Sequence, residues 1–160
     1  MADYLFVTTW EVLVPIERLW PEVKDPETWS TWWPGLVAVK EIEPGDDQAR
    51  GAVMEFRFKS RLPYTLSFRG RITRVEPPTL IEIRTVGELE GVAVYELEDL
   101  GERTRTCLRW SVRTTKPWMN ILAPLARPLF SWNHDLLMKA GARGLSRKLG
   151  AEVRYPEEGS

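Results

Sequence analysis

The sequence has very little of the side-chain chemistry on which metal and redox sites depend. It contains one cysteine and one histidine in 160 residues, Cys107 and His134. A single cysteine excludes a disulfide within the chain and a thiolate metal cluster. Metal ions need clustered His, Cys, Asp or Glu ligands, and neither residue has partners at ligand spacing. Glycine-rich phosphate loops and the G-x-S-x-G and H-E-x-x-H motifs are also missing. We therefore expect no metal site and no cofactor.

An excess of charge and long apolar runs are missing as well. The 22 Lys and Arg residues nearly balance 23 Asp and Glu residues, which gives a net charge of −1. This balance does not favour nucleic acid or an acidic membrane surface as a partner. No uncharged run reaches the roughly 18 residues of a membrane-spanning helix, and we find no signal peptide. We expect a cytoplasmic protein without an integral membrane segment, and its oligomeric state is left open.

Tryptophan, in contrast, is abundant, with eight residues in the chain. So many large rings favour extensive apolar surfaces that face a core or a cavity. The length suits one domain with a substantial core, and there is no repeat, low-complexity segment or linker. We assign residues 1–152 to a single domain and expect residues 153–160 to form a disordered tail.

The N-terminal part of the chain predicts one strand followed by two short helices. Residues 4–14 are apolar and β-branched, which is typical of a strand. Pro15 suits the start of a helix over residues 16–24. Asp25 is a suitable N-cap for a second short helix that ends near Ser30. The aromatic turn at residues 32–35 then ends the helical structure.

The middle of the chain predicts six strands joined by short connections. The clearest alternation lies at residues 52–60, where Met54, Phe56 and Phe58 share one face and Arg57 lies on the other. The six predicted strands span residues 36–43, 52–60, 64–75, 80–86, 92–98 and 103–115. Connections this short require antiparallel pairing. One face of the sheet is apolar and the other carries arginine and glutamate, so we expect one face to be exposed to solvent.

The C-terminal part predicts the only long helix, over residues 129–149. Pro128 suits its first turn, and Gly150 suits its C-terminal stop. At 100° per residue, one face of the helix carries an unusual mixture of bulky, polar and very small residues. These residues are Phe130, Asn133, His134, Leu137, Gly141 and Gly144. The opposite face carries Asp135, Lys139, Arg143 and Ser146.

The two glycines on the inner face need an explanation, because each costs about 1 kcal/mol in a helix interior. Either the helix packs closely there, or Gly141 and Gly144 leave room for a ligand. The polar residues allow alternatives too. His134 is either a hydrogen-bonded core residue or a catalytic acid or base. Asn133 either orients a ligand carbonyl or bonds to the sheet.

These elements predict an α+β fold in which a seven-stranded antiparallel sheet wraps around the C-terminal helix. The order of the elements, together with V-P-I-E-R-L-W at residues 14–20 and W-S-T-W-W-P-G at residues 29–35, resembles the START-like superfamily of helix-grip domains. The W-N-H-D run at residues 132–135, with G-x-x-G-L at 141–145, resembles bacterial members described as polyketide cyclase or lipid-transport related. The resemblance implies a hydrophobic ligand cavity between helix and sheet, but it does not define a reaction, because the superfamily hosts carriers and enzymes.

The residues predicted to line this cavity are those on the inner helix face and the aromatic residues on the inward face of the strands. They are Phe56, Phe58, Tyr64, Phe68, Tyr95, Trp110, Phe130, Asn133, His134, Leu137 and Gly141. His134, Tyr64 and Tyr95 are the candidate acids or bases, because they bring titratable groups to that face.

We interpret the sequence as a domain that binds, with or without transport, a medium-sized hydrophobic or aromatic small molecule. The main alternative is an enzyme of the cyclase or dehydratase type that uses cavity His or Tyr residues. A third hypothesis is an interaction domain whose exposed tryptophans, Trp132 or Trp118, contact a partner.

Overall fold

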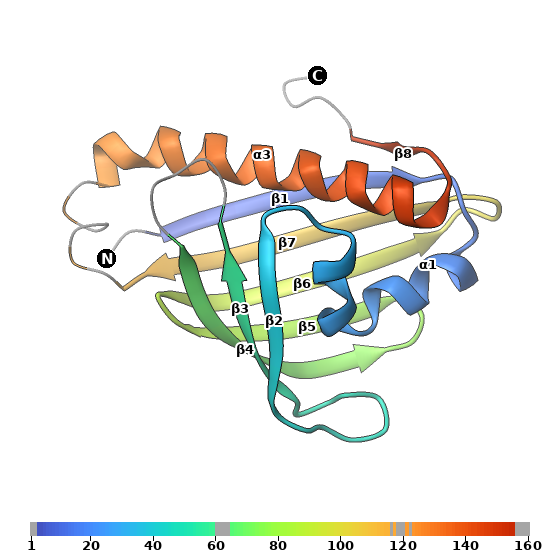
Figure 1. Cartoon of the computed structure of the whole chain (residues 1–160), viewed down its shortest axis with the longest axis horizontal. Coiled ribbons are helices and arrows are strands. Elements are labelled where there is room, and N and C mark those ends of the chain that lie inside the picture. Colours follow the sequence, from blue (N-terminus) through green and yellow to red (C-terminus); the bar gives the residue numbers. More distant parts are fainter. Residues whose placement is uncertain (1–2, 60–64, 116, 118–120, 122, 156–160) are drawn as a thin grey trace.

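The computed structural model describes residues 3–59, 65–115, 117, 121 and 123–155. Within these residues, an eight-stranded antiparallel sheet curves around one long helix, which confirms the predicted α+β helix-grip fold (Figure 1). In chain order the elements are β1 (Asp3–Val12), α1 (Ile16–Val23), the 3-10 helix η1 (Pro26–Thr31), β2 (Leu36–Glu43), β3 (Val53–Phe58), β4 (Leu66–Glu76), β5 (Leu80–Gly87), β6 (Leu89–Asp99), β7 (Thr104–Thr114), α3 (Ala123–Leu149) and β8 (Val153–Arg154).

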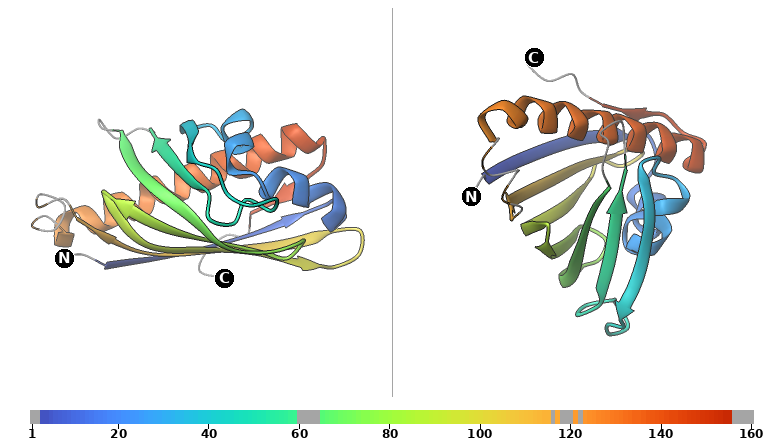
Figure 2. Two further views of the ribbon diagram at one scale, coloured as in Figure 1. Left: turned by 90° about the horizontal axis from the view of Figure 1, so that it is seen from below. Right: turned by 60° about the vertical axis from the view of Figure 1, so that its left-hand side comes forward.

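The order of strands in the sheet is β2-β3-β4-β5-β6-β7-β1-β8, and every neighbouring pair is antiparallel. β2 to β7 follow one another as a meander, as the short connections predict. β1 then closes the sheet against β7, from Asp3 opposite Arg113 to Val12 opposite Thr104. Figure 2 shows α1, η1 and α3 on the same concave face of the sheet. The core therefore lies between these helices and that face.

Alternation along the strands divides buried from exposed side chains as the sequence predicts. Met54 and Phe56 are buried in β3, whereas Arg57 between Phe56 and Phe58 is exposed. The convex face carries cross-strand ion pairs such as Arg105–Glu98, whose closest atoms are 3.3 Å apart. Exposed pairs of this kind contribute only a few tenths of a kcal/mol each. The outer face is therefore a solvated surface and the inner face forms the core.

The two short helices are fixed by one N-cap and one side-chain hydrogen bond. The Asp25 carboxylate accepts a hydrogen bond from the Glu27 backbone N–H at 3.1 Å, which confirms Asp25 as an N-cap. In α1, Ile16, Leu19 and Val23 are buried. The Trp29 indole N–H donates to the Val23 carbonyl at 3.1 Å and joins η1 to α1. These contacts fix η1 against α1.

α3 begins earlier than the sequence predicts. It starts at Ala123 rather than at residue 129, so Pro128 lies inside the helix. Pro124 occupies the first turn, where a missing N–H costs nothing. Pro128 removes one hydrogen bond of the second turn, and the helix continues through it. Gly150 has φ of +64°, the left-handed conformation that a helix-ending glycine supplies. Across the described helices, α3 included, none is both long enough and apolar enough to cross a membrane.

The first residues of the predicted tail are an edge strand. Val153 and Arg154 form β8 opposite Val12 and Glu11 of β1. The Leu13 N–H donates to the Glu152 carbonyl at 2.9 Å and continues the pairing. A two-residue strand is too short for sequence patterning to reveal. Residues 156–160 lie outside the described residues, so for them the disordered tail stays a prediction.

A candidate ligand-binding cavity between helix and sheet

Two small cavities lie side by side between α3 and the concave face of the sheet. The first, which we call the His134 cavity, has a volume of about 70 Å³ and is lined by Tyr4, Phe6, Leu66, Leu89, Trp110, Val112, Thr114, Phe130, Asn133, His134 and Leu137. The second, the Tyr95 cavity, has a volume of about 50 Å³ and is lined by Trp29, Trp33, Phe56, Phe58, Phe68, Ile81, Ile83, Thr85, Ala93, Tyr95, Leu108, Trp110 and Met138. Trp110 lines both cavities, so its side chain forms part of the wall between them.

Most of the residues predicted for the site line one of these cavities. The four helix residues with side chains, Phe130, Asn133, His134 and Leu137, line the His134 cavity. Phe56, Phe58, Phe68 and Tyr95 line the Tyr95 cavity, and Trp110 lines both. Gly141 lines neither cavity, and Tyr64 lies outside the described residues.

The helix glycines serve close packing rather than ligand space. A Cβ atom added to Gly141 would lie 2.8 Å from the Trp33 ring and 3.1 Å from Trp10. At Gly144 the added atom would overlap the backbone carbonyl oxygen of Trp32. Gly141 was therefore wrongly assigned to the cavity wall. The C-terminal half of α3 is the packed half, and the half with bulky residues borders the cavities.

Aromatic rings occupy most of the space between α3 and the sheet. The ring centroid of Phe68 lies 5.3 Å from the ring centroid of Phe56 and 5.3 Å from that of Trp110. Phe6 continues this layer, with its centroid 6.5 Å from that of Trp110. A water molecule takes up about 30 Å³, so each cavity has room for very few waters. A medium-sized ligand needs about 300 Å³ or more, so binding one requires some of these rings to move.

Several buried polar atoms face this aromatic environment without a hydrogen bond. Among the described residues that line the cavities, five polar atoms make no hydrogen bond of good geometry: Tyr4 Oη, Thr85 Oγ1, Tyr95 Oη, Trp110 Nε1 and His134 Nε2. Tyr95 Oη is the weakest case, because the Thr106 side chain also interacts with it. Each buried group left unpaired costs about 1–3 kcal/mol relative to water. Such groups in a folded protein call for an explanation, which a bound molecule or buried water supplies.

His134 is held as a neutral imidazole. Its ring stacks on Phe6 with centroids 4.1 Å apart and planes inclined by 15°. Nδ1 lies 3.8 Å from Asp135 Oδ1, which is longer than a hydrogen bond, so the two residues do not form a relay. Burial lowers the pKa of His134 to about 4. At neutral pH, His134 therefore presents an uncharged nitrogen to the cavity.

The tyrosines that line the cavities remain protonated at neutral pH. Burial raises the pKa of Tyr95, whose side chain is 5% exposed. Burial also raises the pKa of Tyr4, while the Arg127 guanidinium, 4.6 Å above the ring, acts in the opposite direction. A protonated phenol can donate and accept a hydrogen bond. These groups are therefore suited to orienting a ligand.

Several lining residues were not predicted from the sequence. Tyr4 and Phe6 lie on the same face of β1 as Trp10. The residues between them carry no charge, so the sequence does not show which face of this strand is exposed. Trp33 was predicted only as part of a turn. Its indole N–H donates to the Leu137 carbonyl at 2.8 Å, which ties the turn to α3. Thr85 continues the inward parity of Ile81 and Ile83, and this parity could have revealed it.

An apolar stripe lies on the exposed side of α3 and just before it. It consists of Ile121, Leu125, Leu129 and Trp132, whose side chains are 75%, 81%, 45% and 46% exposed. The three positions within α3 fall within 60° on a helix of 100° per residue. Trp118 lies outside the described residues. The exposed Trp132 leaves the interaction hypothesis open.

Comparisons with known proteins point to one family. Residues 5–150 match the family described as polyketide cyclase / dehydrase and lipid transport. A search of curated proteins found no match.

Solved structures share the fold at low sequence identity. The Zhui aromatase/cyclase from Streptomyces sp. R1128 is 15% identical, with 93% of this chain and 94% of that chain covered and a TM-score of 0.76. Norcoclaurine synthase from Thalictrum flavum, in complex with dopamine and hydroxybenzaldehyde, is 13% identical, with 92% and 87% covered and a TM-score of 0.60. A protein from Thermus thermophilus is 15% identical, with 91% and 99% covered and a TM-score of 0.70.

At such identities these structures support the fold alone, whereas the family match spans nearly the whole chain. The helix-grip fold and the START-like resemblance agree with it. The chain belongs to the polyketide cyclase / dehydrase and lipid transport family.

Proposed function

We propose that the protein binds a largely apolar, aromatic small molecule with hydrogen-bonding groups between α3 and the sheet. The observation that carries this proposal is the set of five unpaired polar atoms in an otherwise aromatic lining. A few polar groups within an apolar wall are what orient ligands in protein pockets. Trp110 Nε1 can only donate, so the ligand carries at least one acceptor oxygen.

The two cavities are too small for this ligand until they are joined. Trp110 is the side chain common to both walls, and its indole N–H has no hydrogen bond in the described structure. Turning the ring to another rotamer therefore breaks no hydrogen bond. We propose that the ligand displaces Trp110 and occupies both cavities as one site.

The arrangement of α3 supports such an adjustment. In its C-terminal half, the helix backbone at Gly141 and Gly144 packs directly against neighbouring groups, with no side chain between them. The half that carries Phe130, Asn133 and His134 meets the sheet through side chains that border empty volume. Movement of these side chains costs less than separating the closely packed half. A carrier would use the same property to release its ligand.

The cyclase or dehydratase alternative has less support. It requires a side chain in the cavity to exchange a proton with the ligand, and general catalysis works best with a pKa near the working pH. Burial lowers the pKa of His134 to about 4 and raises the pKa of Tyr95. Both groups are therefore better suited to hydrogen bonding than to proton transfer at neutral pH.

Filling the Tyr95 cavity tests the binding proposal. Ala93 lines this cavity opposite Trp110, and Val94, the next residue, lies on the outer face opposite Arg109. The probe is N-phenyl-1-naphthylamine, a neutral aromatic fluorophore. We expect Ala93→Phe to weaken its binding about tenfold or more, because the new ring takes the ligand's place, while Val94→Phe stays within about twofold of wild type.

Thermal unfolding of the same samples shows whether each variant is folded. Ala93→Leu adds less volume and gives a smaller loss if Ala93→Phe does not fold. Folded Ala93→Phe and Ala93→Leu proteins that bind the probe as tightly as wild type would overturn the proposal. Native mass spectrometry of wild-type protein identifies a molecule that co-purifies, and the same mass should be lost from Ala93→Phe.

A further inference from the structure

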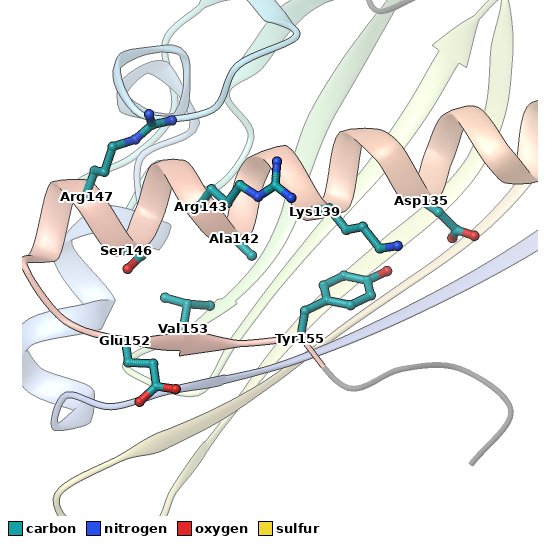
Figure 3. A pocket seen from close by; sticks show the side chains of 9 residues that line it. All are labelled: Asp135, Lys139, Ala142, Arg143, Ser146, Arg147, Glu152, Val153 and Tyr155. Carbon is teal, nitrogen blue, oxygen red and sulfur yellow. The ribbon is translucent and has the colours of Figure 1, made fainter.

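A separate, wider groove lies on the outer side of α3, away from the two cavities. It has a volume of about 870 Å³ and runs between α3 and the segment that contains β8. Lys139, Arg143 and Arg147 line the groove from the helix, and Glu152, Val153 and Tyr155 line it from the other side (Figure 3). None of these residues lines the His134 or the Tyr95 cavity.

The three cations of the groove form a line along the helix. They are spaced four residues apart, and at 1.5 Å per residue each step along the axis is about 6 Å. All three side chains are exposed, and none has an ion pair or hydrogen bond within the described part of the chain. On the sheet, in contrast, Arg105 and Arg113 are paired with carboxylates at 3.3 and 2.8 Å.

Stabilisation of the helix end does not account for this line of charge. A cation interacts favourably with the helix dipole only within the last turn. Arg147 is in the last turn of α3, but Lys139 and Arg143 are ten and six residues before its end at Leu149. The helix dipole therefore does not account for Lys139 and Arg143, and their side chains are free to contact an opposite charge.

The opposite wall of the groove offers a strand edge. β8 is the end strand of the sheet, and its hydrogen-bonded neighbour is β1. The other edge of β8 has no strand beside it among the described residues. An unpaired strand edge is a template for the main chain of an extended peptide. In such a peptide, side chains on one face repeat about every 6.6–6.8 Å, close to the spacing of the helix cations.

We propose that this groove binds an extended acidic segment of a partner protein. Carboxylates at alternate positions of the segment contact Lys139, Arg143 and Arg147, and its main chain pairs with the free edge of β8. Asp135 and Glu152 also line the groove. Their charges, with the net charge of −1, disfavour a continuous polyphosphate such as nucleic acid.

The test uses a fluorescein-labelled peptide of alternating Glu and Val, eight residues long, and measures its binding to the full chain by fluorescence anisotropy. The double variant Lys139→Gln/Arg143→Gln removes two charges from the groove. Arg57→Gln/Arg84→Gln removes two exposed charges from the sheet as a matched control. We expect the groove variant to weaken binding about tenfold and the control to stay within about twofold. Binding should also weaken with added salt.

Other outcomes would overturn the proposal. Equal weakening in both variants would mean that charge acts without a defined site. Equal binding of a Gln/Val peptide would remove the role of carboxylates, and equal binding of a backbone N-methylated Glu/Val peptide would remove strand pairing. If only the variant Glu157→Gln/Glu158→Gln binds the peptide, the chain's own acidic residues occupy the groove in the wild type. If the protein binds phosphatidylserine vesicles through Lys139 and Arg143 but does not bind the peptide, the partner of the groove is a membrane surface.

Discussion

Replacing His134 with methionine should make the protein's stability much less sensitive to acid. His134 is the single histidine of the chain, and its side chain is buried against Phe6. Burial lowers its pKa to about 4, compared with about 6.5 in an unfolded chain. The folded state therefore holds the neutral form, while the unfolded state takes up a proton below pH 6.5. Methionine keeps an apolar side chain of similar size and does not titrate.

The sign and size of the effect follow from this difference. The contribution of His134 to stability is fully present above pH 6.5 and is lost as pH falls from 6.5 to about 4. Below pH 4 the folded state also takes up the proton, so the loss levels off. Two and a half pKa units correspond to about 3 kcal/mol. At pH 4.5 the loss already amounts to about 2.5 kcal/mol, a large share of the 5–15 kcal/mol of a typical domain.

Urea unfolding of wild type and His134→Met at pH 7 and pH 4.5 measures the effect. Both proteins lose stability through their carboxylates, and this common loss cancels in the difference between them. We expect the wild type to lose about 2.5 kcal/mol more than the variant. Equal losses, or an imidazole that titrates near pH 6.5 in the NMR spectrum of the folded protein, would refute a buried neutral His134.

Two further substitutions separate packing from binding. Gly144→Ala should lower the free energy of unfolding by about 1–3 kcal/mol, because its Cβ meets the Trp32 carbonyl; a variant stabilised by the better helix propensity of alanine would contradict this packing. Tyr95→Phe removes a buried hydroxyl that makes no hydrogen bond of good geometry and has only the Thr106 side chain near it. Stability should therefore stay the same or rise by about 1 kcal/mol, while binding of a co-purified ligand weakens. Urea unfolding and titration with that ligand measure both effects, and a loss of stability in Tyr95→Phe would show that the hydroxyl is paired.

The fold could be predicted from the sequence because its strands alternate cleanly. In β3 and β4, charged residues between Phe56 and Phe58 and around Gly70 mark the outer face at every second position. The short connections leave antiparallel pairing as the only arrangement. β1 shows the limit of this signal. Its N-terminal half has no charged residue between Asp3 and Glu11, so the inward placement of Tyr4 and Phe6 was missed.

The role of the glycines could not be predicted in the same way. A glycine on an inner helix face leaves either a hole or a close contact, and periodicity is the same for both. The outcome at Gly141 depends on where the Trp33 ring lies, and this ring is placed by a hydrogen bond to Leu137, 104 residues away in the chain. The start of α3 was missed for a related reason, because both Pro124 and Pro128 satisfy the local rule for a first turn.

The empty volume beside the N-terminal half of α3 accounts for most of the unpaired buried polar atoms. At about 1–3 kcal/mol each, the five atoms together cost an amount comparable to the whole net stability of a domain. Phenylalanine at Tyr95 and valine at Thr85 would remove two of these costs with little change of shape. The helix half beside Gly141 and Gly144 is packed to backbone contact, and the indole N–H groups of Trp10 and Trp32, which pack there, are unpaired as well. Even so, five of the eight unpaired buried side-chain atoms of the described residues belong to the walls of the two small cavities, around Trp110 and His134. Stability alone gives no reason for that coincidence, whereas a bound molecule with complementary oxygen and nitrogen atoms gives one.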